Sequence, residues 1–117
     1  MQIDRTVELD IDRDELWRLI ASPSGWREWL VDDVLGDLVV ERGIVRQVRV
    51  DEVVEGESIA FTWWEEGDPL SVSHVRLTID DGRLQIVEQH AKAEDQAAWE
   101  VRVCSLWAVS VAAALLV

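Results

Sequence analysis

The chain has 117 residues, which is enough for one domain with a real hydrophobic core and leaves little for a second. Its 24 acidic and 11 basic side chains give a net charge of −13, so nucleic acids and anionic membrane surfaces would repel it. We therefore expect a single domain over residues 1–117 that binds neither nucleic acid nor a membrane. All but one of the basic residues are arginines, which fits either a high-salt cytoplasm or a GC-rich genome.

The single cysteine, Cys104, excludes an intramolecular disulfide and is compatible with a reducing compartment. Its apolar neighbours in the sequence predict a buried, unreactive thiol. The first ten residues lack the basic start and apolar core of a signal peptide. These features together favour a cytoplasmic protein.

Residues 2–11 alternate between apolar and polar side chains. The apolar residues from Ile3 to Ile11 fall on one face of an extended chain, a pattern typical of a half-buried strand. Arg5 is the exception, because it places a charge on the apolar face.

Two short helices are expected after this strand. Asp12 and Glu15 have the spacing of a capping box, in which each side chain accepts a hydrogen bond from the other's backbone N–H. Ser22 and Pro23 predict a second helix start, since serine is a good N-cap and proline is tolerated at the first helical position. The expected apolar stripes are Leu16, Trp17, Leu19 and Ile20 in the first helix, and Trp26, Trp29 and Leu30 in the second.

From residue 34 to residue 91 the hydrophobic period is mostly two, which predicts strands. The expected strands cover 34–40, 44–54, the Ile59, Phe61 and Trp63 run, the Val75, Leu77 and Ile79 run, and the Leu84 and Ile86 run. The expected turns are Glu41-Arg42-Gly43, Glu55-Gly56-Glu57, Gly67-Asp68-Pro69 and a tight Asp80-Asp81-Gly82 hairpin. Because the connections are short, we expect an antiparallel meander and, with the first strand, a sheet of about six strands.

The C-terminal residues lose this alternation, and no glycine or proline interrupts them. We expect a helix from about Asp95, more than ~30 Å long and able to cross the whole sheet. Its predicted buried face holds Trp99, Val103, Leu106 and Ser110, with Arg102 on another face. The uncharged run from Val103 is shorter than a membrane span of ~20 residues, so we expect one side to pack on the sheet and the other on a second subunit.

Four segments together carry a resemblance to a known family. They are IDRTVELDIDRDELWRLI, SPSGWREWL, VVEGESIAFTWW and the long helix near Trp99. The chain resembles the START-like (SRPBCC) superfamily, and within it the bacterial homologues of the heat-shock chaperone ATPase activator. It departs from the family's glycine-rich turns at Glu41-Arg42-Gly43 and at Asp80-Asp81-Gly82-Arg83, which shortens two loops.

The resemblance implies an α+β helix-grip fold, in which a curved antiparallel sheet wraps around the long C-terminal helix and an apolar cavity lies between them. It supplies no catalytic motif. The expected cavity-lining residues lie on the inner strand faces, on the buried helix face and at the entrance: Trp26, Val48, Val50, Phe61, Trp63, Val75, Leu77, Ile86, Glu88, His90, Trp99, Val103 and Leu106.

Polar residues on the expected inner face need partners, because a buried charge is costly. Arg5, Arg46, Glu88 and His90 are the residues concerned. They either form Arg–Glu pairs or lie at a solvated strand end, or Glu88 and His90 orient a polar group of the ligand. The other histidine, His74, is expected to be exposed, and the two histidines lack an acidic cluster at zinc-ligand spacing, so neither a metal nor a cofactor is expected.

The tryptophans divide into two groups. Trp17, Trp29 and Trp99 are expected in the core. Trp63 and Trp64 are adjacent and therefore face opposite sides of a strand, with Trp63 inside and Trp64 exposed as a contact surface.

Three functions follow from these patterns. The first is binding of a hydrophobic small molecule or lipid, without catalysis. The alternative is a co-chaperone-like interaction module with a filled cavity. A cyclase or dehydratase ranks third, since it needs an acid/base pair and only Glu88 with His90 or Arg5 is available.

Overall fold

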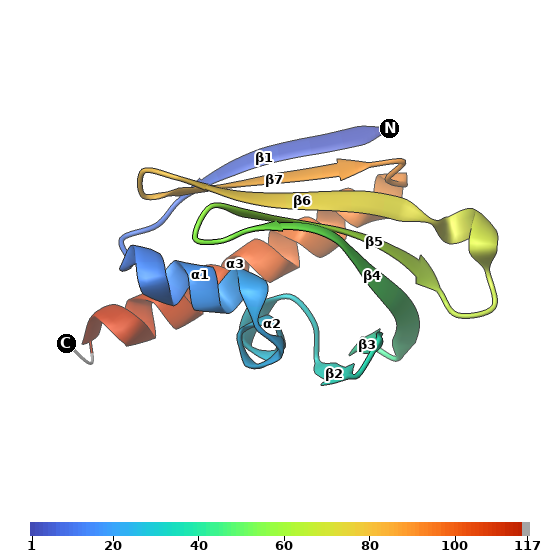
Figure 1. Ribbon diagram of the computed structural model, residues 1–117, viewed down its shortest axis with the longest axis horizontal. Helices are drawn as coiled ribbons and strands as arrows, with labels where there is room; N and C mark the ends of the chain where they lie inside the picture. The colour runs from blue at the N-terminus through green and yellow to red at the C-terminus, as the bar shows by residue number, and fades with distance from the viewer. Residues whose placement is uncertain (116–117) are drawn as a thin grey trace.

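The computed structural model describes residues 1–115 as a seven-stranded antiparallel sheet with two short helices and one long helix (Figure 1). In chain order the elements are β1 (Gln2–Glu8), α1 (Arg13–Ala21), α2 (Pro23–Trp29), β2 (Asp33–Leu35), β3 (Leu38–Glu41), β4 (Ile44–Val54), β5 (Ser58–Glu65), the 3-10 turn η1 (Pro69–Ser71), β6 (Ser73–Asp80), β7 (Arg83–Gln89) and α3 (Ala93–Leu115). This is the α+β helix-grip arrangement expected from the sequence.

The strand order is β1-β7-β6-β5-β4-β3-β2. Every pair of neighbouring strands except β1 and β7 is therefore consecutive in the chain. The first strand pairs with the last, with Gln2 opposite Gln89. In Figure 1, α3 runs diagonally across the sheet and passes α2, against which it packs. The hydrophobic core lies between this helix layer and the sheet.

The predicted single strand over 34–40 is two strands, and this difference raises the strand count from about six to seven. Gly36 adopts a left-handed φ of 62° and reverses the chain, so that Leu35 pairs with Leu38. Glycine adopts this backbone conformation at little cost. The turn was missed because it is short, with Gly36 and Asp37 alone between the apolar runs 34–35 and 38–40.

Two hairpins form as predicted. In the first, Arg42 and Gly43 have positive φ and Glu41 pairs with Ile44. In the second, Asp81 and Gly82 take the same conformation between β6 and β7. Two consecutive left-handed residues give the turn whose twist matches that of the flanking strands.

The start of α1 differs from the prediction. Asp12 is the N-cap residue, but its side chain makes no capping hydrogen bond. Glu15 instead pairs with Arg18, with 2.6 Å between Oε1 and Nη2. The predicted capping box is therefore wrong, because a charged partner three residues away competes for the same carboxylate.

The α1–α2 corner forms as predicted and is tightly packed. The Ser22 hydroxyl accepts a hydrogen bond from the Gly25 N–H at 3.0 Å, and Pro23 begins the helix. A Cβ atom at Gly25 would collide with the carbonyl oxygen of Arg18 and would lie 2.6 Å from the Cα atom of Leu19. Only glycine therefore allows the two helices to approach this closely.

The long helix begins at Ala93, two residues before the expected start. The Lys92 N–H donates to the Asp95 carboxylate at 2.6 Å, which caps the first turn. Trp99, Val103 and Leu106 are buried as predicted.

Two predictions about α3 are wrong. Arg102 lies on the buried face and is only 2% exposed, since it is three residues from Trp99 and four from Leu106. Cys104 is exposed, because it lies on the opposite side of the helix.

The three tryptophans expected in the core differ in burial. Trp17 is only partly buried, whereas Trp29 and Trp99 lie in the core as expected.

Candidate ligand-binding pockets

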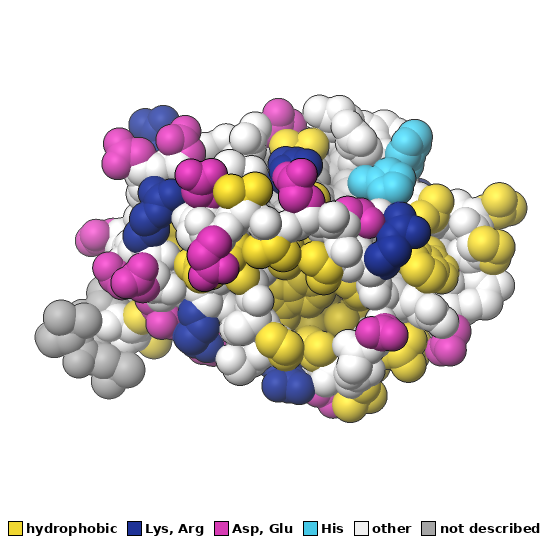
Figure 2. All heavy atoms as spheres, viewed as in Figure 1, with side chains coloured by type: hydrophobic (Ala, Val, Ile, Leu, Met, Phe, Trp, Pro, Cys, Tyr) yellow, Lys and Arg dark blue, Asp and Glu magenta, His cyan; other side chains and the backbone are white. Residues whose placement is uncertain are grey.

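A cavity of about 570 Å³ lies between the α1–α2 corner and strands β2 to β5. We call it the apolar cavity. Its apolar lining includes Trp26, Val34, Val39, Val48, Val50 and Ile59. Figure 2 shows hydrophobic side chains gathered in a hollow on this face of the molecule. Its size and lining suit a small apolar molecule.

Trp26 forms a fixed wall of the apolar cavity. Its indole N–H donates to the backbone carbonyl of Ile20 at 2.6 Å, and its ring centroid lies 4.7 Å from that of Phe61. Because both the polar end and the face of the ring are held, this wall is present before any ligand arrives.

The structure separates the thirteen predicted cavity residues into three groups. Trp26, Val48 and Val50 line the apolar cavity. Trp63, Glu88 and His90 line a second pocket. The others are buried side chains of the sheet and α3 that fill the space between them: Phe61, Val75, Leu77, Ile86, Trp99, Val103 and Leu106.

The second pocket, of about 230 Å³, lies at the end of the sheet where α3 begins. We call it the polar pocket. The β3–β4 hairpin, the end of β5, the start of β6 and the β7–α3 connection supply its walls. Buried members of the wall are Glu41, Trp63, Ser73 and Glu88.

The Glu88 carboxylate is 2% exposed and accepts three hydrogen bonds. The donors are the indole N–H of Trp63 at 3.0 Å, the hydroxyl of Ser73 at 2.7 Å and the indole N–H of Trp99 at 2.9 Å. Strands β5, β6 and β7 and helix α3 therefore meet at one side chain. All three donors are neutral.

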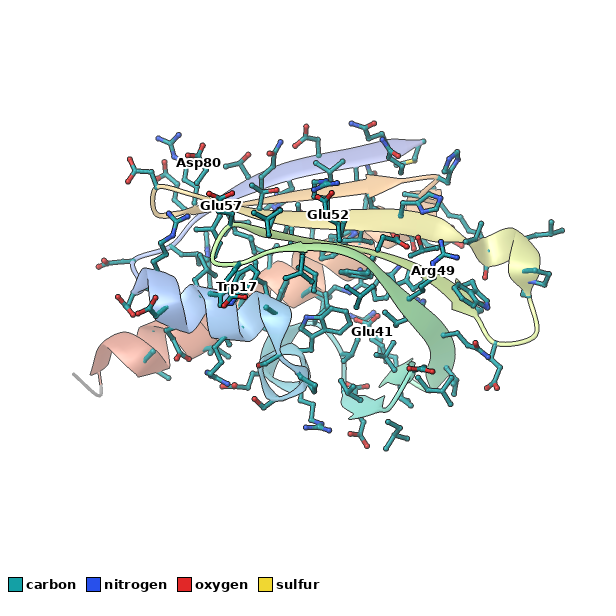
Figure 3. All side chains as sticks on the ribbon, viewed as in Figure 1. Trp17, Glu41, Arg49, Glu52, Glu57 and Asp80 are labelled. Carbon is teal, nitrogen blue, oxygen red and sulfur yellow. The ribbon has the colours of Figure 1, made fainter. Side chains whose placement is uncertain are left out.

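Glu41, which is labelled in Figure 3, holds a second buried network. Its carboxylate accepts two hydrogen bonds from Arg102, at 2.9 Å from Nε and 2.5 Å from Nη2, and a third from Arg46 at 3.1 Å. The Arg102 guanidinium carbon lies 4.4 Å from the Trp99 ring centroid and 5.1 Å from that of Trp63. The two networks are thus in contact through two tryptophans. Of the alternatives left open for Arg46, the structure shows an Arg–Glu pair, with Glu41 as the partner.

Arg5 also forms an Arg–Glu pair, with Glu100 of α3, at 2.8 Å between Nη1 and Oε1. The prediction that His90 continues the face of Glu88 is wrong, because His90 follows the end of β7 with a φ of 64° and is exposed. Its ring lies 5.7 Å from that of His74, which is exposed as predicted.

Trp64 also departs from its prediction. It is partly buried and contributes to the wall of the apolar cavity, although it was expected to be an exposed contact residue. Trp63 is buried, as expected for the inner face.

The sequence interpretation missed the Glu41–Arg102 pair. Glu41 was assigned to a turn, and Arg102 to a helix face other than that of Trp99. Both signals were present: Glu41 is two residues after the buried Val39 in an alternating strand, and Arg102 has helical spacing from Trp99.

Over residues 1–115, no helix is both long enough and apolar enough to span a bilayer. The same residues contain no group of three or more His, Cys, Asp or Glu side chains placed to hold a metal ion.

No protein-family model matches the sequence, and no curated protein matches it. Solved structures do share the fold. Protein CV1439 from Chromobacterium violaceum superposes with a TM-score of 0.73 at 18% identity, over 93% of this chain and 96% of that chain. The AHSA1 protein from Silicibacter pomeroyi gives 0.66 at 17% identity, over 92% and 96%. The Aha1 dimer from Colwellia psychrerythraea gives 0.63 at 13% identity, over 94% and 96%.

These matches confirm the expected resemblance at the level of the fold. The helix-grip proteins named AHSA1 and Aha1 share the whole architecture with this chain. At this level of identity the likeness concerns the fold, and the function has to be argued from the pockets.

Proposed function

We propose that the protein binds a hydrophobic small molecule or lipid in the apolar cavity. The observation that carries the proposal is the cavity itself, about 570 Å³ in volume and lined by aliphatic side chains and Trp26. Cavities of this size and character are typical of small-molecule sites. A folded protein leaves a space of this kind empty only at a cost in packing, so a ligand that fills it adds contacts.

The position of the cavity also supports the proposal. Helix α3 covers the centre of the sheet, and the apolar cavity lies toward the edge formed by β2, β3 and β4. The ligand would therefore lie against the α1–α2 corner. Arg49 and Asp37 are charged residues of the lining, and one end of the ligand would be polar.

The test is native mass spectrometry of gently purified protein, followed by titration with a fluorescent fatty acid. The variant Val48→Trp places a large side chain in the cavity and should abolish binding of the probe. Leu70→Trp is the matched control, since Leu70 is 91% exposed in the η1 turn away from the cavity. Equal binding by Val48→Trp and the wild type would refute the proposal.

An exposed apolar strip on α3 favours a second role, contact with another copy of the chain. The strip consists of Val101, Cys104, Trp107 and Val111, and Trp107 and Val111 are 51% and 61% exposed. We propose that two strips pack together in a homodimer. A chain of net charge −13 repels its own copies least where its surface is uncharged.

Light scattering coupled to size-exclusion chromatography tests the dimer. Trp107→Glu should convert the dimer to a monomer, because it places a charge in each half of the interface. Leu70→Glu adds the same charge outside the strip and should leave the dimer intact. A wild-type protein that stays monomeric at high concentration would rule the homodimer out and leave the strip for an unlike partner, as in a co-chaperone-like module.

A further inference from the structure

The polar pocket contains a buried carboxylate without a charged partner. Among the described residues, no ion pair involves Glu88, and its three hydrogen-bond donors are all neutral. A carboxylate offers about four acceptor positions, so one position is free on Oε1, which accepts only from Trp99. A buried charge is stabilised most by an opposite charge at close range, and Glu88 lines a pocket that a charged group can enter.

The surrounding charges favour a cation. Arg46 lines the pocket but donates to Glu41, as does the buried Arg102. With that network set aside, the remaining acidic residues of the wall outnumber the basic ones: Glu65, Glu88, Glu94 and Asp95 against Arg42 and Lys92. The part of the wall outside the Glu41 network therefore carries a net negative charge, which favours a cation over an anion.

The pKa of Asp95, which also lines the polar pocket, depends on the charge of Glu88. Burial raises the pKa of Asp95 above its ordinary value, and the charges of Glu88 and Glu94 add to this shift, whereas the Lys92 backbone N–H and the charge of Arg102 oppose it. The two side chains thus lie close enough to interact electrostatically. A cation placed between them would be attracted to both carboxyl groups.

The indole of Trp63 does not offer a competing site for a cation. The Arg46 guanidinium carbon lies 4.9 Å from its ring centroid and that of Arg102 lies 5.1 Å away. These two arginines already make the cation–π contacts that the ring allows. A positively charged ligand group is therefore directed to the Glu88 carboxylate.

We propose that the polar pocket is a second binding site, separate from the apolar cavity, for a small molecule that carries an ammonium group. The ammonium group donates a hydrogen bond to Glu88 Oε1. The pocket volume of about 230 Å³ limits the ligand to a compact molecule and excludes a long acyl chain.

The experiment is a titration followed by NMR, with the indole N–H signals of Trp63 and Trp99 as reporters. The probes are n-butylammonium, n-butanol and butyrate, which have similar size and differ in charge. In the wild-type protein, n-butylammonium should shift both signals at concentrations where the other two probes do not. Equal shifts with all three probes, or the strongest with butyrate, would overturn the proposal without any variant.

The variants locate the site. Glu88→Gln keeps the size and one acceptor of the side chain but removes its charge, and should weaken n-butylammonium binding about tenfold or more. Glu52→Gln makes the same charge change at an exposed ion pair with Arg76 and should leave binding unchanged. A loss equal in the two variants would mean that only the net charge matters. Val34→Trp, in the wall of the apolar cavity on the edge strand β2, should also leave binding unchanged, which separates this site from the apolar cavity.

Discussion

The two pockets lie against the same sheet but are built from different interactions. The apolar cavity is bounded by side chains that have few directional requirements, such as Val48 and Val50. The walls of the polar pocket include Glu41 and Glu88, each with three hydrogen bonds that come from other strands and from α3. The walls of the apolar cavity are therefore determined by side-chain volume, and those of the polar pocket by the pairing of charges and hydrogen-bond donors.

This difference predicts different responses to substitution. Losing a methyl group beside open space removes few contacts, because part of the neighbourhood is already empty. Losing one member of a buried network leaves its partners without hydrogen bonds or counter-charges. We therefore expect the polar pocket to tolerate substitution far less than the apolar cavity.

The largest effect is expected for Arg102→Met. It removes both hydrogen bonds from Arg102 to the buried Glu41 and leaves that carboxylate with Arg46 alone. The free energy of unfolding, measured with urea, should fall by about 3–5 kcal/mol. Arg5→Met breaks the exposed pair with Glu100 on the same helix and should cost no more than about 1 kcal/mol. Similar losses in the two variants would mean that the buried network has no special role.

A smaller loss is expected for Trp63→Phe. The substitution keeps an aromatic ring but removes the N–H that donates to Glu88 and Ser73. The expected loss of unfolding free energy is about 1–3 kcal/mol, the usual cost of an unsatisfied buried group. Trp107→Phe, on the exposed strip of α3, should change stability by less than about 0.5 kcal/mol at concentrations where the protein is monomeric. A loss at Trp63 no greater than at Trp107 would contradict the importance of the indole N–H.

The sequence predicts the strands and hairpins well because their signals are local. Alternation places Glu88 on the inner face with Leu84 and Ile86, and the Asp81-Gly82 pair identifies a two-residue hairpin. The Ser22-Pro23 pair likewise predicts the start of α2. In each case a few neighbouring residues determine the backbone conformation.

The sites are less predictable because they depend on which side chains fill the interior. In α3 the buried positions Trp99, Val103 and Leu106 were predicted correctly, but the apolar run that follows marks the edges of this face poorly, and Arg102 and Cys104 were assigned to the wrong sides. A single left-handed residue, His90, removes that side chain from the face that alternation assigns to it. Whether α3 fills the centre of the sheet depends on the curvature of the sheet, which no local pattern encodes.

The apolar cavity should respond weakly to the loss of wall atoms. Val48→Ala removes two methyl groups that border the cavity, and we expect a loss of about 1 kcal/mol or less. Val75→Ala removes the same groups from a side chain that is 1% exposed in the filled core, and should cost about 1.5–3 kcal/mol. Urea unfolding of the two variants measures the difference. Equal losses would show that Val48 is packed as tightly as the core and would argue against an open cavity.

The smallest expected effect is on the pKa of Asp95, and it distinguishes the two pockets by electrostatics alone. Burial raises this pKa, with a further contribution from the charge of Glu88. Because the pKa is higher in the folded than in the unfolded chain, the favourable contribution of Asp95 to stability is complete below its unfolded pKa and is lost as the pH rises through its folded pKa. Glu88→Gln should lower the pKa of Asp95, as measured from its carboxyl carbon by NMR, and so reduce that pH-dependent loss. Val34→Trp should leave it unchanged, because Val34 lines the apolar cavity on the edge strand β2, away from the polar pocket. An unchanged pKa in Glu88→Gln would mean that the two carboxylates do not interact, and the case for a cation in the polar pocket would then rest on Glu88 alone.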